Sequence, residues 1–213
     1  MTAVLAIGMT VVATQAAAAD VSDPVAFVED RATAVLSKLD GKREQVRQDP
    51  EVAQRIVREE LLPHIDVDYI SRLVLGPHWR SASEEQRTRF QEAFQSFLLS
   101  SYAQGLADFT EDRLQVMPLR GEPNPRRTIV QTEVTRENGQ AVPVAFTLHW
   151  TDGGWQLFDV IIEGISYVRN YRTDFNSEIE QKGLDSLIAR LESNGAAKPG
   201  HSGDGPDTKD AGQ

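Results

Sequence analysis

The sequence of 213 residues predicts an α+β domain, in which helices pack on one face of a curved antiparallel sheet of about four strands. Three observations predict this class. Apolar residues recur every three or four positions as far as residue 109, which is the helical period. Between residues 112 and 163, apolar and polar residues alternate as they do in strands. The helical period returns from about residue 166, so further helices follow the sheet.

The first three helices are marked by their boundary residues. An Asp-Pro pair at 23–24 opens an amphipathic helix that Gly41 ends. A second Asp-Pro pair at 49–50 opens a helix that ends before Pro63, and a short third helix closes at Gly76.

The longest predicted helix runs from Glu84 to about residue 109 and is roughly 35 to 40 Å long. Ser83 and Gln86 form a capping-box pattern at its start. Its large apolar residues share one stripe: Phe90, Phe94, Phe97, Leu98, Tyr102, Leu106 and Phe109. One face of this helix is therefore aromatic along nearly its whole length.

The strands are predicted at 112–119, 126–136, 141–151 and 154–163. The turn sequences GEPNP, ENG and DGG separate them, and connections this short join antiparallel neighbours. The last strand leads through Gly164 into a helix near 166–181. A final short helix carries Leu184, Leu187, Ile188 and Leu191.

Both ends of the chain are expected to lie outside the domain, which spans residues 20–192. Residues 1–19 carry no charge and end in alanines that offer an A-x-A site, which predicts a secretory signal peptide. The usual basic residue is missing, because none precedes Arg31, and a membrane span is the competing interpretation. Residues 193–213 contain no large apolar side chain and predict a disordered tail.

The composition restricts the partners. The chain has 32 acidic and 22 basic residues and a pI near 4.9, so nucleic acid and anionic lipid surfaces should repel it. We therefore expect no nucleic-acid partner and no stable membrane span, with docking on a membrane through a protein. The absence of cysteine excludes thiol catalysis, iron–sulfur clusters and cysteine-type zinc sites.

Enzymatic chemistry has little support in the sequence. The histidines do not have the spacing of a metal site: His64, His78, His149 and His201. Residues 164–166 begin like a nucleophile elbow, but Val168 occupies the place of the second glycine. No phosphate loop or dinucleotide fingerprint is present, so we expect no metal, no cofactor and no enzymatic activity.

Asp159 and Glu163 are the acidic residues that most resemble catalytic candidates. Strict alternation divides their strand into one face with Trp155, Leu157, Asp159, Ile161 and Glu163 and another with Phe158, Val160 and Ile162. Carboxylates four residues apart on a strand are about 13 Å apart, too far to act as a pair. The favoured interpretation is a carboxylate that bonds backbone amides or an arginine such as Arg169. The alternative is a single base in a pocket.

Three stretches resemble the MlaC family of periplasmic phospholipid-binding proteins. They are EELLPHIDVDYISRLVLGPHWRSASEEQRTRFQEAFQSFLLSSYAQGLADF (59–109), VPVAFTLHWTDGGWQLFDVIIEGISY (142–167) and KGLDSLIARL (182–191). Their motifs are specific in combination, notably LLP, LVLG-x-x-W-R, S-x-x-Q-R-x-x-F-x-x-A-F, W-Q-x-x-D and E-G-I-S. The likeness spans roughly residues 23 to 192.

This resemblance implies an NTF2-like fold with an apolar cavity that takes the acyl chains of a phospholipid, carried as ligand and not as cofactor. It implies a periplasmic carrier of the Mla pathway that maintains outer-membrane lipid asymmetry. The implied partners are the MCE-domain subunit of an inner-membrane ABC transporter and an outer-membrane lipoprotein–porin complex.

The residues expected to line the cavity are mostly large apolar side chains near the junction between the last strand and its helix: Leu75, Phe97, Tyr102, Val144, Phe146, Phe158, Val160, Ile162, Ile165, Val168 and Tyr171. Tyr102 or Tyr171 is expected at the rim, with its hydroxyl outward. Two alternatives stay open. One is a small-molecule isomerase or dehydratase on the same fold with Asp159 as base, and the other is a module that only binds partner proteins.

Overall fold

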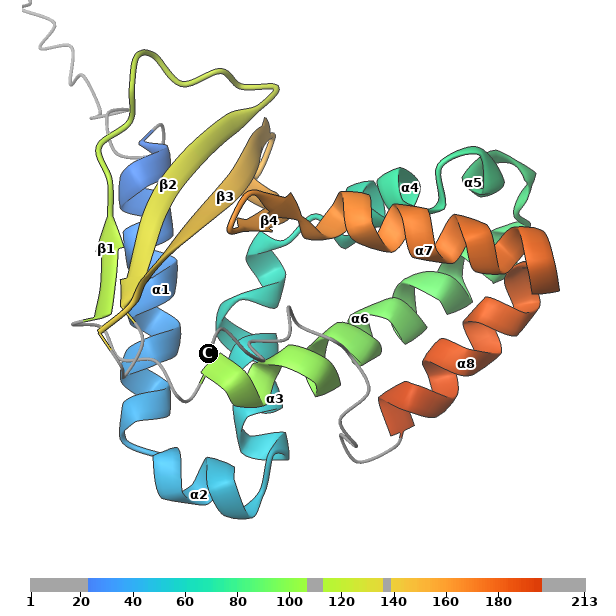
Figure 1. Ribbon diagram of the computed structural model, residues 1–213, viewed down its shortest axis with the longest axis horizontal. Coiled ribbons are helices and arrows are strands. Elements are labelled where there is room, and N and C mark those ends of the chain that lie inside the picture. The colour runs from blue at the N-terminus through green and yellow to red at the C-terminus, as the bar shows by residue number, and fades with distance from the viewer. Residues whose placement is uncertain (1–22, 107–112, 136–138, 197–213) are drawn as a thin grey trace, which may run out of the picture.

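The computed structural model of the protein describes residues 23–106, 113–135 and 139–196. Within them it confirms the α+β class, with helices before and after a five-stranded antiparallel sheet (Figure 1). The predicted signal peptide lies outside the described residues. The last helix reaches Ala196, past the domain boundary predicted at 192, and the rest of the predicted tail is not described. No described helix combines the length and the hydropathy needed to cross a bilayer.

The helices are α1 (Pro24–Asp40), α2 (Arg43–Gln48), α3 (Glu51–Glu60), the 3-10 helix η1 (Leu62–His64), α4 (Val67–Leu75), α5 (Pro77–Ser81), α6 (Glu84–Leu106), α7 (Tyr167–Lys182) and α8 (Leu184–Ala196). The predicted capping box forms, because the Gln86 backbone N–H donates to Ser83 Oγ at 3.1 Å and the Ser83 N–H donates to Gln86 Oε1 at 3.0 Å. Helices α2 and α5 are too short to show a period, and the sequence did not predict them.

The sheet consists of β1 (Leu114–Val116), β2 (Thr128–Thr135), β3 (Ala141–Thr151), β4 (Gly154–Ile162) and β5 (Ile165–Ser166), in that spatial order. Every neighbouring pair is antiparallel, as the short turn sequences predicted. The additional strand is β5, a two-residue piece that turns back on the end of β4 before α7 begins.

A β-bulge changes which residues share a face of β4. Thr147 pairs with Asp159, but its neighbour Leu148 pairs with Leu157, so Phe158 is the extra residue. The strict alternation predicted for this strand was therefore wrong. Trp155 and Leu157 point to the face that carries Val160 and Ile162, whereas Phe158 points to the face of Asp159 and Ile161.

Three apolar clusters form the core. The first is made by α4, α6, α7 and α8 together with Phe158, and the second lies among α1, α2, α3 and α6. The third joins α1 to the sheet through Val28, Val130, Leu148, Trp155 and Leu157. Figure 1 shows α1 alongside the sheet, with α6, α7 and α8 extending away from it. Strand β5, which pairs with the end of β4, leads directly into α7.

Candidate functional site

An apolar ladder crosses one face of the sheet where β3, β4 and β5 pair. Val144 pairs with Ile162, and Ile162 pairs with Ile165. The adjacent rung consists of Phe146 and Val160. Directly paired residues in an antiparallel sheet point to the same side, so these five side chains form one continuous surface, which we call the apolar ladder.

The protein's own core leaves the apolar ladder partly open to solvent. Among the described residues, Val144, Ile162 and Ile165 belong to none of the three clusters. Phe146 and Val160 touch the third cluster but are only half-buried. Ile165 is 53% exposed. Apolar surface left in water costs about 25 cal/mol per Å², so the ladder is suited to an apolar ligand that covers it.

Asp159 fixes the junction between the sheet and α7. Its Oδ2 accepts a hydrogen bond from Ser166 Oγ at 2.6 Å, and its Oδ1 accepts one from the Val168 backbone N–H at 3.0 Å. Ser166 is the N-cap of α7 and accepts from the Arg169 N–H at 3.1 Å. These bonds confirm the favoured interpretation of Asp159 as a carboxylate that bonds backbone amides. Glu163 is exposed and lies on the turn before β5.

An aromatic seam, made of Phe97, Tyr102, Tyr167 and Tyr171, lies between α6 and the start of α7, and Tyr167 is two residues after the ladder residue Ile165. The phenol oxygens of Tyr102 and Tyr171 are 2.5 Å apart, and the Tyr102 ring lies 5.7 Å from that of Tyr167. The Tyr171 ring packs edge-on against Phe97 at 6.0 Å. Burial of this ring, reinforced by its hydrogen bond with the Tyr102 hydroxyl, raises the pKa of the Tyr171 phenol. The Tyr171 hydroxyl pairs with that of Tyr102, which is 44% exposed, and a rim position for either residue stays a prediction.

The structure separates the predicted lining residues. Five form the apolar ladder, while Phe97, Tyr102, Val168 and Tyr171 lie at or beside the aromatic seam. Leu75 and Phe158 instead lie in the first cluster, with 0% and 8% exposure, because α4 packs inward and the β-bulge turns Phe158 to the opposite face. Their lining role, and an enclosed cavity around the ladder, stay predictions.

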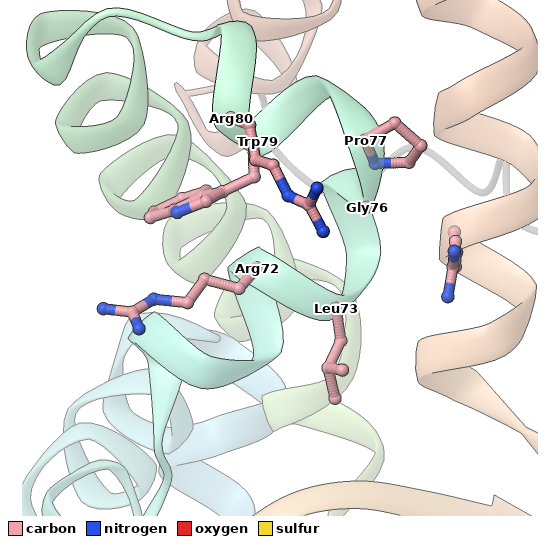
Figure 2. Close-up of a pocket in the computed structure, with 7 residues that line it drawn as sticks. Arg72, Leu73, Gly76, Pro77, Trp79 and Arg80 are labelled. Carbon is pink, nitrogen blue, oxygen red and sulfur yellow. The ribbon is translucent and has the colours of Figure 1, made fainter.

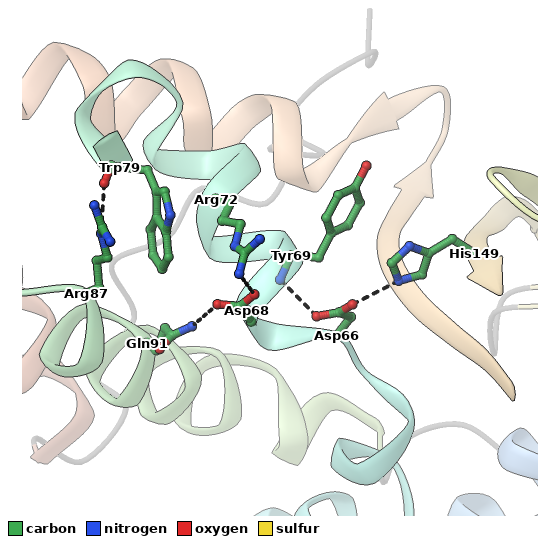
Figure 3. Close-up of polar contacts among 8 residues, drawn as sticks. All are labelled: Asp66, Asp68, Tyr69, Arg72, Trp79, Arg87, Gln91 and His149. Carbon is green, nitrogen blue, oxygen red and sulfur yellow. Dashed lines mark hydrogen bonds and ion pairs between the residues drawn. The ribbon is translucent and has the colours of Figure 1, made fainter. Parts of the chain in front are cut away.

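A second junction, which the sequence reasoning did not identify, ties α4 to the sheet (Figure 3). Asp66 caps α4 by accepting from the Tyr69 N–H at 2.8 Å, and its other oxygen lies 3.0 Å from His149 Nε2. The His149 ring stacks on Tyr69 with ring centroids 4.7 Å apart. His149 therefore has structural partners in Asp66 and Tyr69, as the sequence suggested for a histidine outside any metal-binding pattern. Within the described ranges, no group of three or more histidine or acidic side chains is placed to hold a metal ion.

Two surface pockets are lined by residues outside the predicted set. One, of about 490 Å³, lies among α4, α5 and α7 and is lined by Arg72, Leu73, Gly76, Pro77, Trp79, Arg80 and Arg172 (Figure 2). The other, of about 350 Å³, is formed by polar residues of α7 and α8. No sequence pattern indicates the first pocket, because Arg172 comes from a part of the chain far from Arg72 and Arg80.

Fold and surface together define an α+β protein with a solvent-accessible apolar ladder beside an aromatic seam. Comparison with protein families then places it: the model of the MlaC protein family matches residues 29–193, and the chain belongs to that family. The resemblance carried by the sequence motifs is thereby confirmed.

Two curated relatives cover most of the chain. The intermembrane phospholipid transport system binding protein MlaC of Haemophilus influenzae is 25% identical, over 84% of this chain and 85% of its own. The toluene tolerance protein ttg2D of Pseudomonas putida is 29% identical, over 76% of this chain and 75% of its own.

A solved structure shares the fold. The phospholipid-binding protein from Ralstonia solanacearum, determined in complex with a phospholipid, superposes with a TM-score of 0.74 at 23% identity. The match covers 82% of this chain and 98% of that one.

Proposed function

We propose that this protein is a phospholipid carrier that holds acyl chains against the apolar ladder and the aromatic seam. The observation that carries the proposal is the ladder itself, a continuous apolar surface that the core leaves half-open, with Ile165 more than half exposed. The names of the relatives from Haemophilus influenzae and Ralstonia solanacearum support phospholipid as the ligand.

The energy of transferring a lipid explains why a carrier needs such a surface. Moving an acyl chain of about 16 carbons from an apolar site into water costs roughly 12 kcal/mol of transfer free energy, at about 0.8 kcal/mol for each CH₂. Desorption into water is therefore slow, and a carrier accelerates transfer by covering the chains. Release from the carrier then has to be coupled to a docking partner that opens the site.

Membership of the family supports a wider role for the proposed carrier. The carrier works in the periplasm and shuttles phospholipid between the MCE-domain subunit of an inner-membrane ABC transporter and an outer-membrane lipoprotein–porin complex, which maintains lipid asymmetry. Membership of the MlaC family and the phospholipid transport named for the Haemophilus influenzae relative support this role. The net charge of −10 favours delivery through protein docking over adsorption to an anionic bilayer.

The enzyme alternative is less favoured by the geometry of Asp159. Both of its carboxylate oxygens already accept hydrogen bonds at the start of α7, from Ser166 Oγ and the Val168 N–H. A general base has to reach the proton that it removes from a substrate. The local bonds of Asp159 account for its position without any substrate.

The test is native mass spectrometry, with lipid extraction, of protein purified from a periplasmic fraction. We expect about one phospholipid for each protein molecule, and its loss in a folded Ile165→Glu variant, because a charge on the ladder is costly to bury against acyl chains. Two controls should keep their lipid. Ile165→Leu preserves the apolar contact, and Gln131→Glu places a charge on the opposite face of the sheet.

A negative result would be equally clear. Folded protein that carries no phospholipid after purification, and takes up none from vesicles in the presence of the membrane complexes, would overturn the carrier function. Loss of lipid in Gln131→Glu as well as in Ile165→Glu would show that the ladder is not the site.

A further inference from the structure

Two arginine side chains without a partner line the pocket among α4, α5 and α7. Within the part of the chain that the structure describes, the guanidinium groups of Arg80 and Arg172 make no hydrogen bond or ion pair. Their neighbours are engaged. Arg72 pairs with Asp68 at 2.6 Å, and Arg87 donates to the Trp79 carbonyl at 2.9 Å. In a protein with a net charge of −10, these two guanidinium groups place unpaired positive charge at one pocket.

The rest of the pocket wall is apolar or aromatic. Leu73, Pro77 and the Trp79 ring line it together with the arginines (Figure 2). The Trp79 ring is held from two directions, because the Arg72 guanidinium lies 5.8 Å and the Arg87 guanidinium 5.2 Å from its centroid (Figure 3). The pocket therefore offers positive charge and a fixed apolar surface at the same place.

Gly76 allows Arg172 to reach this pocket. It has a φ of +53°, which other residues rarely adopt, and a Cβ at this position would lie 3.3 Å from Nε and a terminal nitrogen of Arg172. The absent side chain lets the guanidinium of α7 lie close against the backbone between α4 and α5. Arg172 is thus positioned by tertiary packing.

We propose that this pocket docks an acidic segment of a partner protein. Carboxylates of that segment bind Arg80 and Arg172, and an adjacent apolar side chain packs against Trp79 and Leu73. Binding of the segment depends on the pocket's own residues, whereas the use of this binding during lipid transfer rests on the proposed function. None of the ladder residues lines the pocket, so a partner docked here leaves the apolar ladder uncovered.

The charge distribution favours a protein segment over an anionic membrane. An anionic bilayer presents a broad negative surface. This surface repels the whole protein, because the protein has a net charge of −10. A short acidic segment interacts mainly with charges within about 8 Å, the screening length at physiological salt, and so it responds to the local arginines. Arginine and tryptophan are also the side chains that most often dominate binding energy at protein interfaces.

The proposal is tested by nuclear magnetic resonance on the isotope-labelled chain. The probe is a capped hexapeptide of alternating glutamate and leucine, and the matched control replaces each glutamate with glutamine. We expect the acidic peptide to shift the indole N–H signal of Trp79 and the side-chain N–H signals of Arg80 and Arg172. The glutamine peptide should leave them in place, and the shifts should weaken as salt is added.

Charge-neutral variants locate the site. Arg80→Gln and Arg172→Gln should each weaken binding of the acidic peptide by about three- to tenfold, the range expected for one charge-assisted contact near a surface. Arg55→Gln, on the exposed side of α3, makes the same charge change and should bind as the wild type does. All three variants should keep their phospholipid, which separates failure of the docking proposal from failure of the carrier function.

Three results would overturn the docking proposal. The first is an absence of peptide-induced shifts at these residues. The second is an equal effect of Arg55→Gln, which would indicate nonspecific attraction. The third is binding of inorganic phosphate or of phosphatidylglycerol vesicles at the pocket without binding of the acidic peptide, which would identify an anion or membrane site instead.

Discussion

The phenol oxygens of Tyr102 and Tyr171 lie 2.5 Å apart and join α6 to α7 beside the apolar ladder. The Tyr171 ring also packs against Phe94 at 5.4 Å and Phe97 at 6.0 Å, so one residue of α7 contacts three side chains of α6. In the carrier function, any separation of α6 from α7 that admits a lipid has to break this hydrogen bond.

Alkaline pH should reveal the buried phenol of Tyr171. Its pKa is raised, chiefly by burial, so the folded state holds this proton more tightly than the unfolded state. The stabilisation is complete below about pH 10, the ordinary pKa of tyrosine, and is lost as the pH rises above it. Between pH 8 and 11, the free energy of unfolding measured with urea should therefore fall less steeply in Tyr171→Phe than in the wild type.

The matched control for this experiment is Tyr102→Phe. At neutral pH both variants lose the same hydrogen bond and should be about 1 kcal/mol less stable. Only Tyr171→Phe removes the buried phenol, so Tyr102→Phe should keep most of the alkaline decline. Equal slopes in Tyr171→Phe and the wild type would contradict the assignment.

Asp159 should matter for stability and not for lipid binding. Asp159→Asn removes the charge and one acceptor at the start of α7, and we expect a loss of about 1 to 2 kcal/mol in the free energy of unfolding. Glu163→Gln, at an exposed carboxylate on the turn before β5, should change the free energy of unfolding little. Native mass spectrometry should find phospholipid retained in both variants. A folded Asp159→Asn protein without lipid would contradict the structural role.

Substitutions of Leu75 and Ile162 should distinguish a residue of the core from a residue that contacts the ligand. Leu75 is fully buried, so Leu75→Ala should lower the free energy of unfolding of the lipid-free protein by about 2 to 5 kcal/mol. Ile162 is half-buried on the ladder, and Ile162→Ala should cost only about 1 kcal/mol. Lipid occupancy should show the reverse order, with the larger loss in Ile162→Ala. The same order in both measurements would place Ile162 in the core.

Replacing Gly76 with any residue that has a side chain should destabilise the protein. Gly76→Ala forces a residue with a Cβ to a φ of +53° and brings it against Arg172, so we expect a loss of about 1 to 3 kcal/mol in the free energy of unfolding. Gly121→Ala is the control, because Gly121 has a φ of +88° but nothing within 4 Å of the added Cβ. Only Gly76→Ala should shift the side-chain signals of Arg172 and weaken binding of the acidic peptide. Unchanged Arg172 signals would contradict the close approach.

Local chemistry made most of the fold predictable. The Asp-Pro pair at 23–24 and the capping box of Ser83 and Gln86 act within one turn of helix, so their effect is readable from neighbouring residues. The turn sequences likewise predicted the antiparallel order of the strands. Of the candidate site, the sequence identified the ladder side chains of β3 and β4 through their alternation, and it identified the family through its motifs.

Two features of the site were decided only by the tertiary structure. The β-bulge at Phe158 depends on how β3 and β4 pair, and one extra residue reverses the face of every side chain before it on β4. The pocket of Arg80 and Arg172 depends on α7 packing against α4 and α5, which brings together residues far apart in the chain. The sequence by itself determined the longer helices, the first four strands and the family, because their signals lie within a few residues or in ordered motifs. Which side chains meet was determined by long-range pairing and packing, which no local pattern records.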